Sequence, residues 1–189
     1  MTTAQDGRAP RADARRNRER IVEAARETFA AEGPGASLNE IARRAGIGPG
    51  TLYRHFPNRA ALQAAVLQDR IERLCARAAE LRETASPDEA LALWLRAFLA
   101  HARTDHGLAG QLMVDGRGGL GIDCHQMIRD AAASVLDRAR SAGAARPDVS
   151  PADMIDLVVG VALAAGEPDP ADPGRPERLL GLVLDALRG

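Results

Sequence analysis

The sequence predicts an all-α fold with an N-terminal three-helix domain, built around a helix-turn-helix, and a C-terminal helical domain. Apolar residues recur at helical spacing through most of the chain. Aromatic residues make up only 3% of the 189 residues, and β-branched residues seldom occur in runs, which argues against strands. Helix start and stop signals separate the apolar segments and divide the chain into several helices.

Residues 1–12 are expected to form a disordered basic arm, because they are polar, include Gly and Pro and lack apolar periodicity. The first helix follows and runs to about residue 31. Ile21, Ala25 and Phe29 recur at i, i+4 and i+8 and form its core-facing stripe. Gly33 and the proline after it end this helix.

The next segment carries signals for a helix, a tight turn and a second helix. Ser37 followed three residues later by Glu40 predicts a capping box at the start of the first of these helices. Gly46 can adopt the left-handed backbone conformation that ends a helix sharply. Pro49 suits the first turn of a new helix, because its missing N–H would find no partner there. We therefore expect residues 13–60 to form a helix-turn-helix domain.

A helix-turn-helix lays its second helix in the major groove of DNA. Ile47 and Leu52 are expected to pack inward, which leaves the polar side chains of this helix exposed. Arg54 and Thr51 are best placed to reach base edges, since arginine binds guanine in a bidentate manner and threonine can contact a thymine methyl group. The predicted DNA-binding residues are Ser37, Arg43, Arg44, Gly48, Pro49, Gly50, Thr51, Tyr53, Arg54, His55 and Arg59.

Some of these positions have a second interpretation. Arg43 and Arg44 could belong to a solvated helix face, and we expect one of them to contact DNA. Tyr53 could pack against the first helix. Arg59 and the expected cap Asn58 lie at a helix N-terminus, which is a natural phosphate site.

The string IARRAGIGPGTLYRHFPNRAAL, preceded by a helix that ends in ETFAAEG, resembles the DNA-binding domain of TetR-type transcriptional regulators. The resemblance covers residues 15–65 and implies that Tyr53 and His55 contact phosphates. The sequence departs from the family at one place. A lysine is usual near the start of the helix after the phenylalanine, and Arg59 stands there, which keeps a phosphate-binding cation with altered geometry.

The charge of the chain is unevenly distributed, although the formal net charge is only −1. Residues 1–60 contain 11 arginines and 7 acidic residues, whereas residues 61–189 contain 14 arginines and 19 acidic residues. The positive part coincides with the helix-turn-helix, where phosphate neutralisation is needed. Six arginines near the N-terminus either bind phosphates or stay solvated beside acidic neighbours: Arg8, Arg11, Arg15, Arg16, Arg18 and Arg20.

The C-terminal domain, residues 61–189, is predicted to begin within a long helix that spans about residues 58–84. Ser150 and Asp153 form a capping arrangement before one of the later helices. Further helices are expected from residue 87 onward, over 122–142, over 153–165 and over 177–187, with a short segment at 107–114 and a flexible loop at 115–121.

The resemblance implies that this second domain dimerises and encloses a small-molecule pocket, and LWLRAFLAHARTDHGLAGQL also looks like the C-terminal domain of one TetR-type subgroup. The last two helices are apolar over much of their circumference, so they need cover on more than one side. A bundle with the same helices of a second copy provides it, whereas burial within one subunit is the alternative. Their apolar residues are Leu157, Val158, Val161, Leu179, Leu180, Leu182, Val183 and Leu187.

A ligand pocket is predicted from residues that share helix faces in this domain. Its members are Trp94, Phe98, His101, Met113, His125 and Ile128. The first three lie at i, i+4 and i+7, where a histidine on an apolar face either orients a ligand or is a core histidine with a satisfied hydrogen bond. Asp123, Cys124 and His125 diverge by about 100° per residue on a helix, so they cannot chelate one ion alone. No metal or cofactor is expected.

The composition predicts a cytoplasmic protein without a membrane partner. Cys75 and Cys124 are far apart in the sequence and indicate no disulfide framework, as is usual in a reducing compartment. The first 20 residues are charged and lack the apolar core of a signal peptide. The longest apolar run, near residues 157–165, is too short to span a bilayer.

These observations predict a sequence-specific DNA-binding transcriptional regulator that is not an enzyme. We expect a homodimeric repressor that binds a near-palindromic double-stranded DNA operator and is released by an unknown small-molecule effector. The alternative is a helical small-molecule carrier or enzyme with an incidental basic N-terminus. The sequence contains no evident nucleophile–base pair, Glu-x-x-His motif or phosphate loop that would favour an enzyme.

Overall fold

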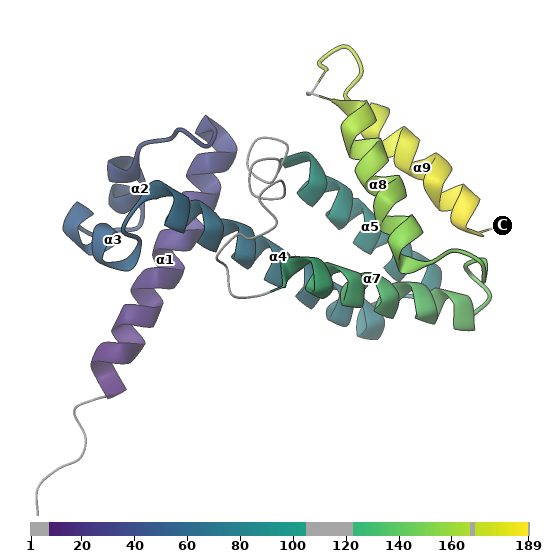
Figure 1. The fold of residues 1–189 in the computed structure, drawn as a ribbon, viewed down its shortest axis with the longest axis horizontal. Helices are drawn as coiled ribbons and strands as arrows, with labels where there is room; N and C mark the ends of the chain where they lie inside the picture. Colours follow the sequence, from purple (N-terminus) through teal and green to yellow (C-terminus); the bar gives the residue numbers. More distant parts are fainter. Residues whose placement is uncertain (1–7, 105–122, 167–168, 189) are drawn as a thin grey trace, which may run out of the picture. The chain divides into compact units, whose positions relative to one another are not determined.

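The computed structural model describes residues 8–104, 123–166 and 169–188, and all regular elements in these ranges are α-helices (Figure 1). The predicted all-α fold class is therefore confirmed. The chain forms two compact units, residues 1–69 and 70–189. In chain order the helices are α1 (Arg8–Glu32), α2 (Leu38–Arg44), α3 (Pro49–His55), α4 (Arg59–Thr84), α5 (Pro87–Thr104), α7 (Cys124–Ser141), α8 (Pro151–Ala165) and α9 (Arg175–Arg188).

Helix α1 begins earlier than the sequence predicted. Residues 8–12, which were expected in a disordered arm, belong to this helix, and residues 1–7 lie outside the described ranges. Two alanines and two arginines among these five residues have high helix propensity. Pro10 is tolerated because it lies in the first turn, where its missing N–H is not needed.

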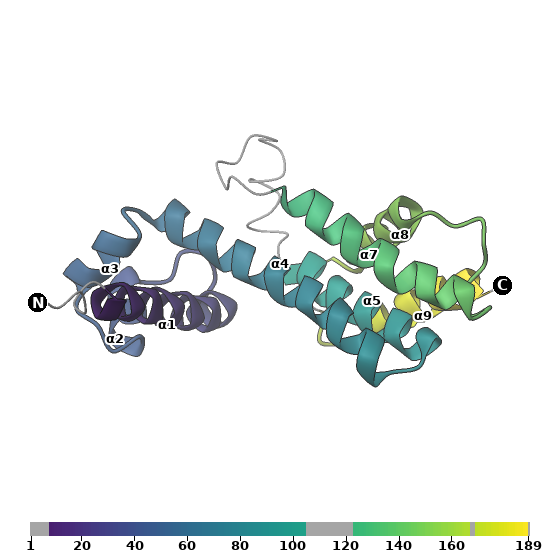
Figure 2. The same ribbon diagram turned by 90° about the horizontal axis from the view of Figure 1, so that it is seen from below.

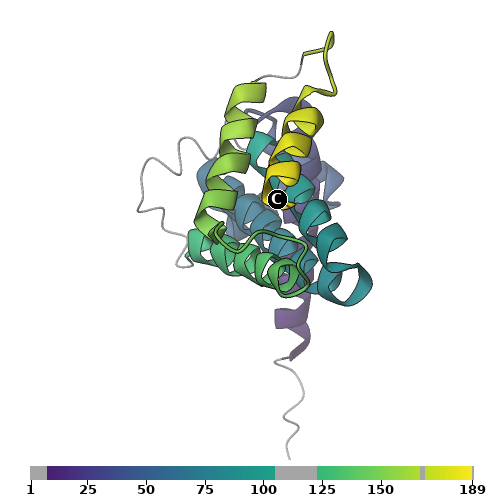
Figure 3. The ribbon, with the colours of Figure 1, turned by 90° about the vertical axis from the view of Figure 1, so that its right-hand side faces the viewer.

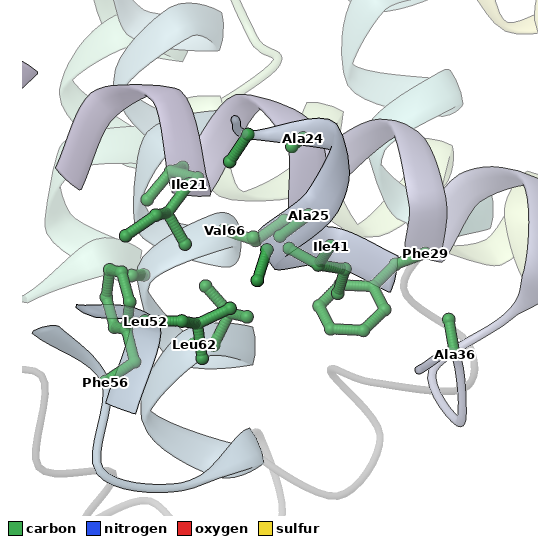
Figure 4. Close-up of a cluster of buried hydrophobic side chains, with 14 residues drawn as sticks. Ile21, Ala24, Ala25, Phe29, Ala36, Ile41, Leu52, Phe56, Leu62 and Val66 are labelled. Atoms are coloured by element: carbon green, nitrogen blue, oxygen red, sulfur yellow. The ribbon is translucent and has the colours of Figure 1, made fainter. Parts of the chain in front are cut away.

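The core of the first unit is built by α1, α2, α3 and the first turns of α4. The predicted stripe of α1 is buried, with Ile21 and Ala25 fully inaccessible to solvent. Ile21, Leu52 and Phe56 lie together near one end of the cluster, whereas Phe29 lies near the other end (Figure 4). Burial of each large apolar side chain contributes about 1.5–3 kcal/mol, so this cluster fixes α3 against α1.

The two predicted capping boxes have different outcomes. At α8, Ser150 and Asp153 form both halves, because the Asp153 N–H donates to the Ser150 hydroxyl and the Ser150 N–H donates to the Asp153 carboxylate. At α2, the Glu40 N–H donates to Ser37 Oγ at 3.4 Å, but the Glu40 carboxylate turns to two arginines. Only half of the box predicted at α2 is therefore present, since charged guanidinium donors compete with a backbone N–H for the same carboxylate.

In the second unit, α5 contacts α7, α8 and α9, while α8 contacts α7 on one side and α9 on the other. Figure 2 shows α7 next to α5 and α8, and Figure 3 shows α8 and α9 side by side. Trp94 of α5 is fully buried, stacks on Phe98 with 5.5 Å between ring centroids, and donates its Nε1–H to the Leu74 carbonyl at 3.1 Å. Trp94 thus links α5 to the second half of α4.

The predicted short segment at 107–114 and loop at 115–121 lie outside the described residues. Along the described ranges, no helix combines the length and the apolar character needed to cross a membrane.

Candidate nucleic-acid interface

The turn between α2 and α3 has the geometry of a helix-turn-helix. Gly46 follows α2 with φ at +65°, a left-handed conformation in which residues with a Cβ are strained. The Ile47 N–H donates to the Ala42 carbonyl at 3.0 Å, which closes the end of α2. Gly48 then adopts an extended conformation, and Pro49 occupies the first turn of α3. The predicted turn chemistry is thus present at both positions.

Helix α3 is amphipathic in the way that DNA binding requires. Leu52 is 1% exposed and anchors the helix in the core, whereas Tyr53, next to it in the sequence, is 49% exposed. The alternative in which Tyr53 packs inward against α1 is therefore not what the fold adopts. Arg54 is also exposed, and its Nη2 donates to Thr51 Oγ1 at 3.0 Å. This hydrogen bond holds the two predicted base-reading side chains together on the outer face of α3.

The glycines and caps around α3 leave its N-terminal end open. Gly48, Pro49 and Gly50 are all exposed, and a Cβ added to either glycine would meet nothing within 4 Å. Ser37, the cap of α2, is exposed as well. His55 at the end of α3 is half-buried beside Phe56, with 6.5 Å between the two ring centroids. The two glycines therefore place no side chain of their own between the first turn of α3 and a DNA backbone.

Arg43 and Arg44 on α2 are both engaged with acidic side chains. Arg43 donates to both oxygens of the Glu40 carboxylate, at 2.8 and 2.6 Å, and Arg44 donates to the same carboxylate at 2.9 Å. Arg44 also donates to Glu32 of α1 at 3.0 Å. These hydrogen bonds, from Arg43 first and then from Arg44, lower the pKa of Glu40 to about 2. Arg43 and Arg44, one of which is expected to contact DNA, therefore both have an anionic partner within the chain.

Arg59, a predicted phosphate-binding residue, donates hydrogen bonds within the first unit. Its Nη1 donates to the carbonyls of Pro34 and Ala36, at 3.1 and 2.5 Å. Gln63, one turn further along α4, donates to the same Pro34 carbonyl at 3.0 Å. Asn58 caps α4 as expected, by accepting a hydrogen bond from the Ala61 N–H. Arg59 thus forms hydrogen bonds with the loop between α1 and α2.

Two arginines of α1 contact residues that flank α3, although they were not among the predicted DNA-binding residues of the helix-turn-helix. The guanidinium of Arg18 lies over the Phe56 ring, 5.4 Å from its centroid. The guanidinium of Arg20 lies against the turn, where a Cβ added to Gly46 would be 2.5 Å from its Nη2. The sequence contained the arginines but no signal for these contacts, because they depend on how α1 crosses the helix-turn-helix.

The predicted ligand-pocket residues are only partly brought together. Trp94, Phe98 and His101 line one face of α5, and Phe98 stacks on His101 with 6.3 Å between ring centroids. All three are buried, as is Ile128 of α7. His125, in contrast, is exposed at the start of α7, because it lies on the outer face of that helix. Met113, the remaining member of the predicted set, lies outside the described residues.

The two cysteines are free thiols that are partly covered by neighbouring side chains. The Cys75 thiol donates to the Met127 carbonyl of α7 at 3.5 Å. Burial raises the pKa of both Cys75 and Cys124, which disfavours the reactive thiolate form.

An open groove runs between α8 and α9 on the side away from the core. Its volume is about 630 Å³. The lining residues are mostly small or apolar: Asp153, Asp156, Leu157, Gly160, Val161, Ala164, Leu179 and Val183. Leu157 is 46% exposed there, and Leu182 of α9 is 67% exposed. Five of the eight residues predicted at a dimer interface are thus accessible or line this groove, whereas Val158, Leu180 and Leu187 belong to the core of one subunit.

Two family models match the chain. One, described as "Bacterial regulatory proteins, tetR family", matches residues 21–66, which include α2 and α3. The other, described as "Transcriptional regulator SbtR-like, C-terminal domain", matches residues 86–189, which is more than half of the chain.

Solved structures resemble the chain over nearly its whole length. A TetR transcriptional regulator from Streptomyces coelicolor is 39% identical, with a TM-score of 0.78, and the match covers 90% of this chain and 98% of that one. A TetR transcription regulatory protein from Mycobacterium vanbaalenii is 37% identical, with a TM-score of 0.74, over 95% of this chain and 99% of that one.

Two curated relatives match about a third of the chain. The HTH-type transcriptional regulator TtgW from Pseudomonas putida is 45% identical over 60 residues, which are 31% of this chain and 45% of the relative. An HTH-type transcriptional regulator from Staphylococcus aureus is 49% identical over 59 residues, which are 31% of this chain and 32% of the relative. Each match spans less than half of the curated relative.

Both family models and the solved structures, which together cover both units, agree on one family. The chain belongs to the TetR family of transcriptional regulators.

Proposed function

We propose that the protein is a homodimeric repressor that binds a near-palindromic DNA operator and is released from it by a small-molecule effector. The observation that carries the proposal is the exposed outer face of α3. It presents Tyr53 and Arg54 to solvent while Leu52 fixes the helix in the core. Regulators of this family bind DNA operators, typically as dimers, and are generally not enzymes.

Base recognition is assigned to Arg54 and Thr51. A guanidinium can bind guanine through two hydrogen bonds, which discriminates against other bases by about 1–3 kcal/mol. The hydrogen bond from Arg54 to Thr51 restricts the guanidinium before DNA arrives, which lowers the entropy lost on binding. Tyr53 and His55 are assigned to phosphates, together with the exposed backbone of Gly48 and its neighbours.

Dimerisation is assigned to the groove between α8 and α9. Exposed leucines beside an apolar groove need cover, and a second copy of the same two helices supplies it through a two-fold axis. Two recognition helices related by that axis would contact half-sites about 34 Å apart, which requires an inverted repeat in the DNA.

The effector is expected to bind near the apolar face of α5, where Phe98 and His101 lie. His101 would supply the polar group that orients a ligand in an otherwise apolar site. Release of DNA requires only that the effector binds the non-operator conformation more tightly than the operator-bound one. A DNA-binding regulator must meet the chromosome, so we place the protein in the cytoplasm.

Selection of duplexes from a random pool by the purified protein tests this proposal. An enriched inverted repeat, bound by two protomers in sedimentation analysis, is the expected result. A folded protein that enriches no sequence and shows no salt-dependent duplex affinity would contradict the proposal. It would then favour the alternative of a helical carrier or enzyme with an incidental basic N-terminus. An operator–reporter assay then distinguishes repression from activation.

A further inference from the structure

The arginines of the first unit fall into two groups by their partners. On α1, Arg15 pairs with Glu19 at 3.5 Å, Arg16 with Asp13 and Arg26 with Glu23. On α2, Arg43 and Arg44 share the Glu40 carboxylate. Each of these guanidiniums has its charge offset by a carboxylate of the same chain. A phosphate that binds one of them must first displace this internal anion.

The other group includes Arg54 and Arg59, which donate to a hydroxyl and to backbone carbonyls, and also Arg18 and Arg20 of α1. Within the described part of the chain, neither Arg18 nor Arg20 forms an ion pair with an acidic side chain. Arg18 instead rests on the Phe56 ring, and Arg20 rests against the turn at Gly46. An aromatic face attracts a cation but leaves its N–H donors available at the edge of the guanidinium. The positive charge of these two residues is therefore not neutralised locally.

Arg18 and Arg20 both lie beside residues that flank α3. Gly46 lies three residues before the start of α3, and Phe56 follows its last residue. Arg20 thus stands at the turn that leads into the helix that would enter the major groove, and Arg18 stands at the residue that follows this helix. A phosphate backbone borders each side of that groove, and contacts to both backbones fix the register of a protein on the duplex.

We propose that α1 supplies the main phosphate-binding cations of this regulator, through Arg20 at the turn before α3 and Arg18 beside Phe56 after it. Arg43 and Arg44 remain bound to Glu40 and contribute little to the salt dependence of DNA binding. The inference rests on the proposed DNA-binding function, and among the arginines that the sequence left open it selects Arg18 and Arg20 over Arg43 and Arg44. The contacts are independent of base sequence, so they set affinity and position without setting operator preference.

The salt dependence of affinity tests the inference, because each lost phosphate contact reduces the slope of log Kd against log salt concentration by about 1. We would measure this slope by fluorescence anisotropy on a random-sequence duplex of about 30 base pairs, long enough for two half-sites. Arg18→Gln and Arg20→Gln should each reduce the slope by about 2 for a dimer, since both subunits lose a contact. Arg20→Lys, which keeps the charge, should restore most of the slope.

Arg15→Gln is the matched control on the same helix, because Arg15 is already paired with Glu19. It and Arg43→Gln should leave the slope within about 0.5 of the wild-type value. Thermal unfolding of each variant shows whether the fold is intact, and this matters most for Arg18, which also packs on Phe56. The selected operator should keep its preference over the random duplex in the Arg20→Gln variant.

Unchanged slopes in folded Arg18→Gln and Arg20→Gln proteins would overturn the inference, as would a larger loss in Arg43→Gln. Neither result would affect the proposed function, because the wild-type protein would still bind duplex DNA with a salt-dependent affinity. If the wild-type protein binds no duplex at any salt concentration, the proposed function itself fails. The two failures are therefore distinguishable in one titration series.

Discussion

The guanidinium of Arg20 fills the space into which a side chain at residue 46 would project. A Cβ built on Gly46 would stand 2.5 Å from Arg20 Nη2, and the φ of this glycine is +65°. The turn between α2 and α3 thus depends on glycine for its backbone conformation, and a side chain at this position would also displace the guanidinium of Arg20.

Gly46→Ala should destabilise the protein by about 1–2 kcal/mol, because alanine is strained in the left-handed region. Arg20 must also move, which should weaken duplex binding. Gly48→Ala is the matched control, since Gly48 has φ at −75° and open space around it. Chemical denaturation of both variants checks the prediction, and equal stability of the two would contradict it.

Leu52 and Tyr53 should separate stability from DNA binding. Leu52→Ala removes a side chain that is 1% exposed and should cost about 2–5 kcal/mol of unfolding free energy. Tyr53→Phe removes only a hydroxyl from a residue that is 49% exposed, so stability should change by less than about 0.5 kcal/mol. Operator affinity should nevertheless fall in Tyr53→Phe if the hydroxyl contacts a phosphate. Anisotropy titrations and denaturation curves on the same samples give both readouts.

The ion pairs of Glu40 predict a specific pH dependence. The folded state lowers the pKa of Glu40 from 4.5 to about 2, through hydrogen bonds from Arg43 and then Arg44. A carboxylate with a depressed pKa stabilises the fold fully above its unfolded pKa, and this contribution disappears as pH falls through its folded pKa. The melting temperatures of wild type and Glu40→Gln should therefore differ above about pH 4.5 and converge towards pH 2. A constant difference over this range would show that the pair does not form.

Leu157→Glu should break the dimer without unfolding the subunit. Leu157 is 46% exposed and lines the groove between α8 and α9, so a carboxylate there is solvated in the monomer but buried in the proposed interface. Sedimentation should show a shift from dimer to monomer, together with weaker operator binding. Leu93→Glu, at an exposed leucine of α5 outside the groove, is the control and should remain dimeric. A dimeric Leu157→Glu protein would move the interface elsewhere.

Trp94 reports on the proposed effector site, because it is the only tryptophan of the chain and stacks on Phe98. Its full burial predicts blue-shifted emission in the free protein. A compound that releases DNA by binding near Phe98 and His101 should change the intensity or wavelength of this emission. A compound that releases DNA and leaves the emission unchanged would place the effector site away from α5.

The sequence predicted the helix-turn-helix well because its signals are local. The caps at Ser37 and Ser150, the left-handed Gly46 and Pro49 in the first turn of α3 each depend on residues a few positions away. A buried stripe such as Ile21 and Phe29 likewise follows from helical periodicity alone.

The partners of the arginines could not be predicted in the same way. Arg59 bonds to carbonyls more than 20 residues earlier, and Arg20 meets Gly46 only because α1 crosses the turn. Glu40 had two competing sets of donors within one helical turn, and the choice between a backbone N–H and two guanidiniums depends on side-chain geometry. His125 is exposed and does not lie with the other predicted pocket residues, because packing against α5 and α8 determines which face of α7 is buried.

The hydrogen bonds of Arg59 and Gln63 to the Pro34 carbonyl connect the first turns of α4 to the loop that leads into α2. Two side chains one turn apart on α4 donate to the same carbonyl, and Arg59 also donates to the carbonyl of Ala36, the residue before the cap of α2. The start of α4 therefore cannot slide or rotate without pulling on the start of α2. A movement at the start of α4 would therefore be transmitted to the N-terminal end of α2, which is the end away from the turn. The helix-turn-helix could thus be displaced without any change in the exposed residues of α3.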